Sequence, residues 1–140
     1  MNILKVLTDK RKTGNVGEDA VCRYLKRNGY KILERNYVSS GHEIDIVAED
    51  KEHICFVEVK TRTQGIDEAW IRPADAVDAK KQRSIISAAR EFALATYGRK
   101  KYRFDVAEVF LDKKQKVISI NYLVSAFTLD GNSYRYQKKG

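Results

Sequence analysis

The spacing of apolar residues along the chain predicts two helices and five strands. In two segments apolar side chains recur every three or four positions, which is the period of a helix with one buried face. Elsewhere they form short runs or alternate with polar residues, as they do in strands. The predicted elements are a helix at 14–29, a strand at 31–38, two strands within 41–62, a helix at 76–97, and strands at 102–111 and 117–123. This order, αβββαββ, predicts an α/β fold with a mixed β-sheet and flanking helices.

Residues 41–62 are predicted to form a β-hairpin. The polar turn at 49–52 separates two apolar runs at hairpin length. Because side chains alternate across a strand, every second residue of each run should point into a core. These inward residues are Ile44, Ile46, Val57 and Val59. The run at 54–59 is apolar almost throughout, which is typical of a central strand covered on both faces.

Charged side chains occupy the other side of this hairpin. Glu43 and Asp45 share one side of the first strand, and Glu58 and Lys60 share one side of the second. A turn that closes near the middle of 49–52 places Asp45 opposite Glu58 or one residue away. Facing like charges destabilise a hairpin, whereas a bound Mg²⁺ or Mn²⁺ reverses the repulsion because hard cations take carboxylate oxygens. Asp45 and Glu58 are therefore the predicted metal ligands.

A divalent cation beside a lysine suits the hydrolysis of a phosphodiester. The metal polarises a phosphoryl oxygen and activates a water, and Lys60 can orient that water or stabilise the developing charge. The alternative is a solvated hairpin face, on which carboxylates and lysines are common. An ionisable residue in a covered strand is costly, so the combination of E-x-D, turn, apolar strand and E-x-K favours the metal site.

Four motifs resemble those of the YraN-like family of small bacterial proteins. They are GNVGEDA at 14–20, EID at 43–45, FVEVKTR at 56–62 and KKQR at 80–83. The match extends from about residue 13 to Phe127, which is most of the chain. More broadly, the pattern is similar to the PD-(D/E)-x-K nucleases, the restriction-endonuclease-like superfamily that includes archaeal Holliday junction resolvases.

This resemblance implies a restriction-endonuclease-like sheet with a catalytic core of Asp45, Glu58 and Lys60. The helix-borne carboxylate of the superfamily corresponds to Glu18, although the position of Glu18 alone would indicate only an acid favoured by the helix dipole. His42 stands where the family usually has a glycine directly before Glu-Ile-Asp. The roles of His42 and Glu43 therefore stay open.

Composition and charge point to a single domain that attracts a polyanion. A chain of 140 residues, 43% hydrophobic and 33% charged, is expected to form one domain at 1–130 followed by a polar tail at 131–140. Its net charge of +8, from 27 basic and 19 acidic residues, favours binding to nucleic acid. The predicted nucleic-acid contacts are Arg62, Lys80, Lys81, Gln82 and Arg83.

Other features predict a cytoplasmic protein without a membrane partner. Cys22 and Cys55 lie in regular apolar segments and are expected to be buried free thiols. The N-terminal segment MNILKVL is too short and too soon interrupted by charge to act as a signal peptide, and no apolar run approaches the length of a membrane span.

Two functions fit these observations. The first is a metal-dependent nuclease that hydrolyses phosphodiester bonds in DNA, selects particular DNA structures and uses Mg²⁺ or Mn²⁺. The alternative is a non-catalytic nucleic-acid-binding protein that retains the nuclease fold. Carboxylates clustered where phosphates must approach favour the first function. The sequence does not choose between DNA and RNA, is compatible with a homodimer, and leaves open whether activity needs a partner protein.

Overall fold

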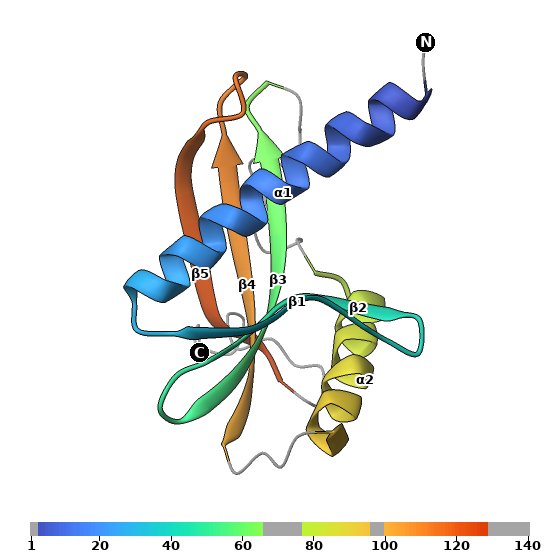
Figure 1. Ribbon diagram of the computed structural model, residues 1–140, viewed down its shortest axis with the longest axis vertical. Coiled ribbons are helices and arrows are strands. Elements are labelled where there is room, and N and C mark those ends of the chain that lie inside the picture. The colour runs from blue at the N-terminus through green and yellow to red at the C-terminus, as the bar shows by residue number, and fades with distance from the viewer. Residues whose placement is uncertain (1–2, 66–76, 96–99, 129–140) are drawn as a thin grey trace, which may run out of the picture.

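The computed structural model describes residues 3–65, 77–95 and 100–128. The elements follow the predicted order αβββαββ (Figure 1). They are α1 (Ile3–Arg27), β1 (Lys31–Ser39), β2 (His42–Glu49), β3 (His53–Thr63), α2 (Ala79–Ala95), β4 (Lys101–Leu111) and β5 (Val117–Phe127). The predicted α/β fold with a mixed sheet and two flanking helices is confirmed.

Two elements are longer than their sequence patterns indicated. α1 begins at Ile3 rather than near residue 14, and the helix continues through Gly14 although glycine is a poor helix former. β5 continues to Phe127, past a break in the alternation at Ser125, whose φ is 52°. The turn between β2 and β3 lies where predicted, and Asp50 Oδ1 accepts the backbone N–H groups of Glu52 and His53 there.

The five strands form one sheet in the order β1-β2-β3-β4-β5. β3 and β4 are parallel, and the other neighbouring pairs are antiparallel. α2 belongs to the connection between the two parallel strands, as such a connection must cross from one end of the sheet to the other. β3 is therefore a central strand, as its apolar sequence predicted.

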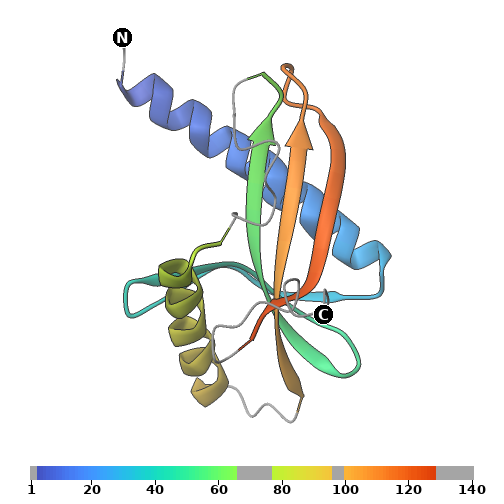
Figure 2. The ribbon, with the colours of Figure 1, turned by 180° about the vertical axis from the view of Figure 1, so that it is seen from behind.

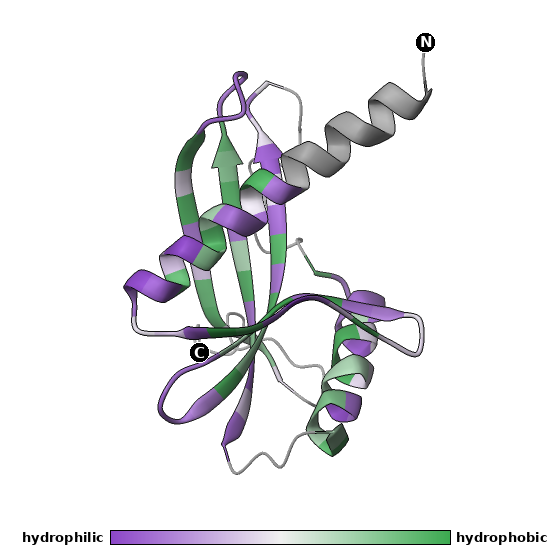
Figure 3. Cartoon of the chain, in the orientation of Figure 1, coloured by the Kyte–Doolittle hydropathy of each residue, from purple (hydrophilic) through white to green (hydrophobic). Residues whose placement is uncertain are grey.

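The helices cover opposite faces of the sheet (Figures 1 and 2). Neighbouring residues of β3 show this division, because Phe56 packs with α2 whereas Val57 packs with α1. In Figure 3 the β2–β3 and β4–β5 turns are hydrophilic, while much of β4 and β5 is apolar. The core thus consists of two clusters, one on each side of the sheet.

The predicted inward residues of the hairpin do not share one cluster, and that expectation was wrong. Ile46, Val57 and Val59 lie with α1, whereas Ile44 lies with α2. The reason is that β2 pairs with β3 only from Ile46 onward, and the unpaired residues before Ile46 present a different face. Cys22 and Cys55 are buried and free, as predicted. Among the described residues, neither helix combines the length and apolarity that crossing a bilayer requires.

Candidate active site

The predicted acidic residues lie where β2 and β3 separate. The two strands pair from Glu49 opposite Ile54 as far as Ile46 opposite Val57, and no further pair follows. At the next position, Asp45 Oδ2 accepts a hydrogen bond from the backbone N–H of Val59 at 2.8 Å. The Asp45 carboxylate thus accepts the backbone N–H of Val59, in place of the backbone carbonyl that continued β2–β3 pairing would have supplied. This bond holds Asp45 beside β3.

Glu58 is a buried carboxylate with little compensation. Its residue is 3% exposed, and its nearest cation is Lys81 Nζ of α2, 3.5 Å from Glu58 Oε2. Burial, and after it the neighbouring Asp45, raise the pKa of Glu58 to about 8, although Lys81 and Lys60 act to lower it. Asp45 and Glu58 are also within hydrogen-bonding reach of each other. Two carboxylates in contact, one of them buried, form the kind of perturbed pair that marks functional sites.

Lys60 lies two residues beyond Glu58 on β3 and is partly buried. Alternation along the strand directs both side chains to the side of the sheet that α2 covers, because Val57 and Val59 pack on the α1 side. The charge of Lys60 acts on Glu58. The structure therefore brings Asp45, Glu58 and Lys60 together, as the sequence pattern predicted.

Glu18 reaches this region from α1 because Gly17 allows the helix to approach β3. Gly17 is buried, and a Cβ atom added to it would overlap Thr61 Oγ1 of β3. The next residue, Glu18, has a side chain that is 13% exposed, and it lies 3.6 Å from Arg35 Nη2. Burial and then Asp45 raise the pKa of Glu18, while Arg35 opposes them. Asp45 thus acts electrostatically on both Glu18 and Glu58.

The sequence did not single out Asn36, which connects two of the carboxylates. Its φ is 52°, a conformation that asparagine tolerates better than most residues. With its amide nitrogen facing the acids, Asn36 donates to Glu18 Oε1 at 3.1 Å and to Glu43 Oε1 at 3.2 Å. Glu43 is exposed and is held on the α1 side by this bridge. An asparagine inside a strand pattern is the only signal that could have indicated such a position.

The predicted nucleic-acid contacts fall into two groups. Lys80, Lys81 and Arg83 lie in the first turns of α2 with at least partly exposed side chains. Asp78 caps this helix end, since its Oδ1 accepts the N–H of Lys81 at 2.8 Å. The second group makes internal contacts or is buried: Arg62 is 9% exposed, and the half-buried Gln82 donates through Nε2 to the Val77 carbonyl at 3.1 Å. Direct contact with a nucleic acid is therefore not expected at Arg62, whereas Gln82 stays a predicted contact.

His42 has a structural contact. Its Nδ1 lies 2.7 Å from Ser84 Oγ of α2, and nearby Ser39 donates to Glu91 of the same helix. These bonds attach the tip of the β1–β2 hairpin to α2 and so help to hold β2 away from β3. They position Asp45 indirectly.

Asp45 and Glu58 fit a divalent cation that keeps most of its water. Among the residues that the structure describes, no three His, Cys, Asp or Glu side chains gather closely enough to hold a metal ion by themselves. Mg²⁺ commonly binds one or two carboxylates together with waters and substrate phosphates. A cation beside Glu58 would also favour the ionised form that burial disfavours. The donor set is therefore compatible with Mg²⁺ or Mn²⁺.

Comparison with known proteins identifies relatives of similar length. A UPF0102 protein of Caldanaerobacter subterraneus subsp. tengcongensis is 39% identical over 125 residues, which are 85% of this chain and 97% of the relative. One of Alkaliphilus oremlandii is 41% identical over 121 residues, covering 84% of this chain and 98% of the relative. One of Chlorobium phaeobacteroides is 40% identical over 124 residues, covering 86% and 94%.

The family profile described as "Uncharacterised protein family UPF0102" matches residues 17–109. This range includes Glu18, Asp45, Glu58 and Lys60. The profile and the relatives agree with the YraN-like resemblance that the motifs indicated. The chain therefore belongs to the UPF0102 family.

Proposed function

We propose that this protein is a metal-dependent nuclease that hydrolyses phosphodiester bonds in DNA and prefers particular DNA structures. The observation that carries the proposal is the contact between Asp45 and Glu58 at the point where β2 and β3 separate, with Lys60 on the same strand as Glu58. The four motifs and the five-stranded mixed sheet support placing the family within the restriction-endonuclease-like superfamily.

Asp45 and Glu58 are held in position in different ways. Asp45 is held by the Val59 N–H at 2.8 Å, so its free oxygen can face a cation without rearrangement. Glu58 comes from the rigid central strand β3. A Mg²⁺ or Mn²⁺ ion held by this pair would supply Lewis acidity toward the phosphoryl oxygen and acidify a bound water.

Two lysines, Lys60 on β3 and Lys81 on α2, lie near Glu58 and can interact with negative charge on the substrate. Lys60 of β3 is placed to orient the attacking water or to donate to an oxygen on which charge develops. Lys81 of α2 is 3.5 Å from Glu58, longer than a good hydrogen bond. We infer that Lys81 can turn from Glu58 to a phosphate when substrate and cation arrive, since its side chain is 40% exposed.

Glu18 acts as a positioning residue in this proposal. It lies on α1, on the other side of the sheet from Lys81, and its charge acts on Asp45. Arg35 and Asn36 hold its carboxylate in place. Its role is to orient and electrostatically tune Asp45 rather than to supply the main contact with the metal.

Cleavage assays test the proposal directly. Branched, nicked, single-stranded and duplex DNA are incubated with purified protein in Mg²⁺ or Mn²⁺, and Asp45→Asn is compared with Glu34→Gln, which removes an exposed carboxylate. Wild type and Glu34→Gln should cut at least one structure, whereas Asp45→Asn should lose about 10²-fold or more of the rate. A wild-type protein that cuts none of these substrates with either metal would refute the nuclease.

The competing function is nucleic-acid binding without cleavage. One observation favours it, namely that no third carboxylate among the described residues joins Asp45 and Glu58 in a metal-sized group. Calorimetric titration with Mn²⁺ separates the two functions. The nuclease requires a binding signal that Asp45→Asn abolishes, and equal signals from both proteins would favour the binding module.

A further inference from the structure

The turn between β4 and β5 carries three lysines in four positions, Lys113, Lys114 and Lys116 with Gln115 between them. All three lysines are exposed. Asp112 Oδ1 accepts the backbone N–H of Lys114 at 2.8 Å and that of Lys116 at 2.9 Å. Asp112 N–H also donates to the Lys116 carbonyl at 2.8 Å. The turn is therefore a bonded structure that presents its lysines in a defined arrangement.

This turn lies at the end of the sheet toward which β3 runs (Figures 1 and 3). Thr63 at the end of β3 pairs with Leu111 at the end of β4, and Gln64 N–H donates to the Leu111 carbonyl at 2.9 Å. A Cβ added to Gly65 would be 3.0 Å from Lys113 Cε. The lysine turn is thus joined to the strand that carries Glu58 and Lys60.

Charge is balanced at one end of the sheet and not at the other. At the β2–β3 turn, Lys100 Nζ donates to Glu49 Oε2 at 3.1 Å, and Arg103 lies 3.5 Å from Asp50. At the β4–β5 turn, no acidic side chain among the described residues forms an ion pair with any of the three lysines. The carboxylate of Asp112 is occupied by backbone donors. An excess of positive charge therefore remains at this end.

We propose that the lysine turn (Lys113, Lys114 and Lys116) binds the phosphate backbone of DNA on one side of the cleavage site. Lys60 is level with Glu108 in the parallel register, and the turn begins a few residues beyond. At about 3.3 Å per residue of strand, the turn lies about 15 Å from Lys60. Because phosphates are spaced by about 3.4 Å of helix axis along each strand, the contact falls four or five nucleotides from the scissile phosphate. This inference rests on the proposed nuclease function and adds the path of its substrate.

The test compares two double variants with the same change of charge. Lys114→Gln/Lys116→Gln removes two exposed lysines from the turn, and Lys51→Gln/Lys101→Gln removes two exposed lysines from the opposite end of the sheet. Affinity for fluorescein-labelled duplex and branched DNA is measured by anisotropy over a series of salt concentrations, and circular dichroism checks the fold. Loss of two phosphate contacts should reduce the slope of log Kobs against log salt by about 1.8 and weaken binding about tenfold or more near 0.1 M salt. The Lys51/Lys101 variant should keep the wild-type slope.

The possible outcomes separate this inference from the proposed function. Equal weakening in both double variants, or none in either, would overturn the role of the turn while leaving the nuclease intact. A wild type that binds no DNA even at low salt would overturn both. Where wild type cuts DNA, a second measurement applies: substrates that end fewer than about four nucleotides beyond the mapped cut should be cut equally by wild type and the Lys114/Lys116 variant. An unequal rate on these short substrates would also count against the inference.

Discussion

Two buried carboxylates on neighbouring strands, Asp105 of β4 and Glu58 of β3, differ in how their charge is satisfied. Asp105 is 0% exposed and Glu58 is 3% exposed. Asp105 accepts hydrogen bonds from Arg103 Nη2 at 2.8 Å, from Tyr122 OH at 2.6 Å and from the Ser125 N–H at 2.9 Å. Glu58 has the Lys81 ammonium at 3.5 Å and a second carboxylate, Asp45, beside it.

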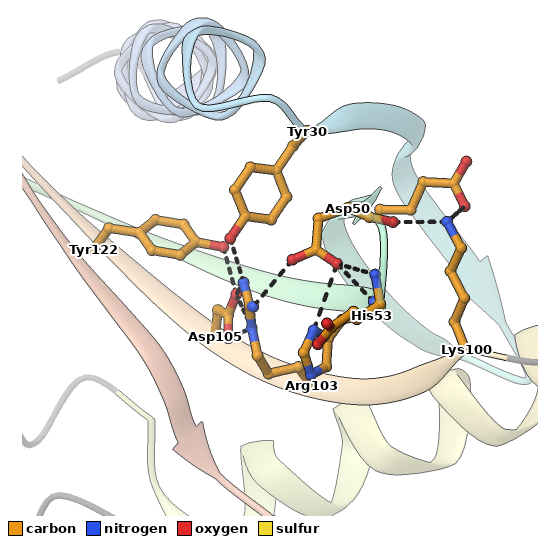
Figure 4. A network of polar contacts seen from close by, with 9 residues as sticks. Tyr30, Asp50, His53, Lys100, Arg103, Asp105 and Tyr122 are labelled. Atoms are coloured by element: carbon orange, nitrogen blue, oxygen red, sulfur yellow. Dashed lines mark hydrogen bonds and ion pairs between the residues drawn. The ribbon is translucent and has the colours of Figure 1, made fainter.

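The surroundings of Asp105 form a closed polar network (Figure 4). Arg103 also donates to Tyr30 OH at 2.7 Å and lies 3.5 Å from Asp50. The network joins Tyr30, which directly precedes β1, the β2–β3 turn and strand β5. Burial and the Asp105 charge raise the pKa of Tyr122, so the phenol stays protonated and keeps donating. A buried ion whose hydrogen bonds are all made serves the fold.

Burial alone therefore does not identify a functional acid in this protein. Glu58 differs from Asp105 in that its negative charge is poorly compensated. The close neighbour of Asp105 is the guanidinium of Arg103, whereas a close neighbour of Glu58 is a second carboxylate, Asp45. Such an arrangement persists only where another demand outweighs its cost, and a cation-dependent reaction is one such demand.

The largest expected effect comes from breaking the Asp105 network. Asp105→Ala leaves Arg103 buried without its main partner, which costs about 3–5 kcal/mol for a buried pair. Urea denaturation should show a much lower midpoint, whereas Glu52→Ala at an exposed site should stay near wild type. A loss below about 1 kcal/mol would mean that the network contributes little to stability and would weaken the comparison.

The next effect is on catalysis through Lys60. Lys60→Ala should reduce single-turnover cleavage about 10²-fold or more, because a preorganised donor acts mainly in the transition state. DNA affinity should change little, since one lysine makes one phosphate contact. Lys60→Arg should also lose cleavage activity, because a guanidinium is bulkier than an ammonium group and stays protonated. Lys51→Ala is the exposed control, and cleavage by Lys60→Ala at the wild-type rate would exclude a catalytic role for this lysine.

A moderate effect concerns the dependence of stability on pH. The pKa of Glu58 is about 8 in the folded protein, against an ordinary value of 4.5. Between these pH values the folded protein keeps a proton that the unfolded chain has lost, so the metal-free protein should lose stability as pH rises from about 4.5 to 8. Thermal melts should show this slope in wild type and a weaker slope in Glu58→Gln. Mn²⁺ should raise the melting temperature of wild type near pH 8 and leave Glu58→Gln unchanged; the same Mn²⁺ shift in both proteins would argue against Glu58 as a ligand.

The smallest effect is expected at Asn36. Asn36→Gly removes the amide between Glu18 and Glu43 but tolerates the positive φ. We expect near-wild-type stability with a severalfold loss of cleavage rate, because Glu18 loses a donor that holds it. Ser40→Gly, at another positive φ in the β1–β2 turn, is the matched control. Equal activity of the two variants would mean that Asn36 serves only to adopt the positive φ and that its side-chain amide does not affect cleavage.

Local rules were enough to predict much of the candidate site. The polar turn at 49–52 and the two-residue period of strands together placed Asp45 near Glu58, with Lys60 on the same side of β3. Those rules act over a few residues, and the turn length sets the register. The order of elements followed in the same way from the periods of the apolar residues.

Only the tertiary structure decided which other groups reach this pair. Lys81 stands 23 positions after Glu58 in the numbering and comes beside it through the crossover to α2. Glu18 comes close to Asp45 because Gly17, which has no side chain, lets α1 pack directly against Thr61 of β3. Asn36 reaches Glu18 and Glu43 from a backbone conformation with positive φ, which the periodicity of a strand does not reveal.

The sequence by itself thus determined the elements, their order and the acidic pair, because each depends on neighbours along the chain. The separation of β2 from β3 and the balance of charge around each buried acid were decided by the folded structure. Asp105 and Glu58 look alike as single acids within apolar strands. One acquires an arginine from its own strand and a tyrosine from the next, whereas the other faces a second carboxylate. The difference arises only when strands and helices pack, because Tyr122 reaches Asp105, and Asp45 and Lys81 reach Glu58, from other elements of the chain.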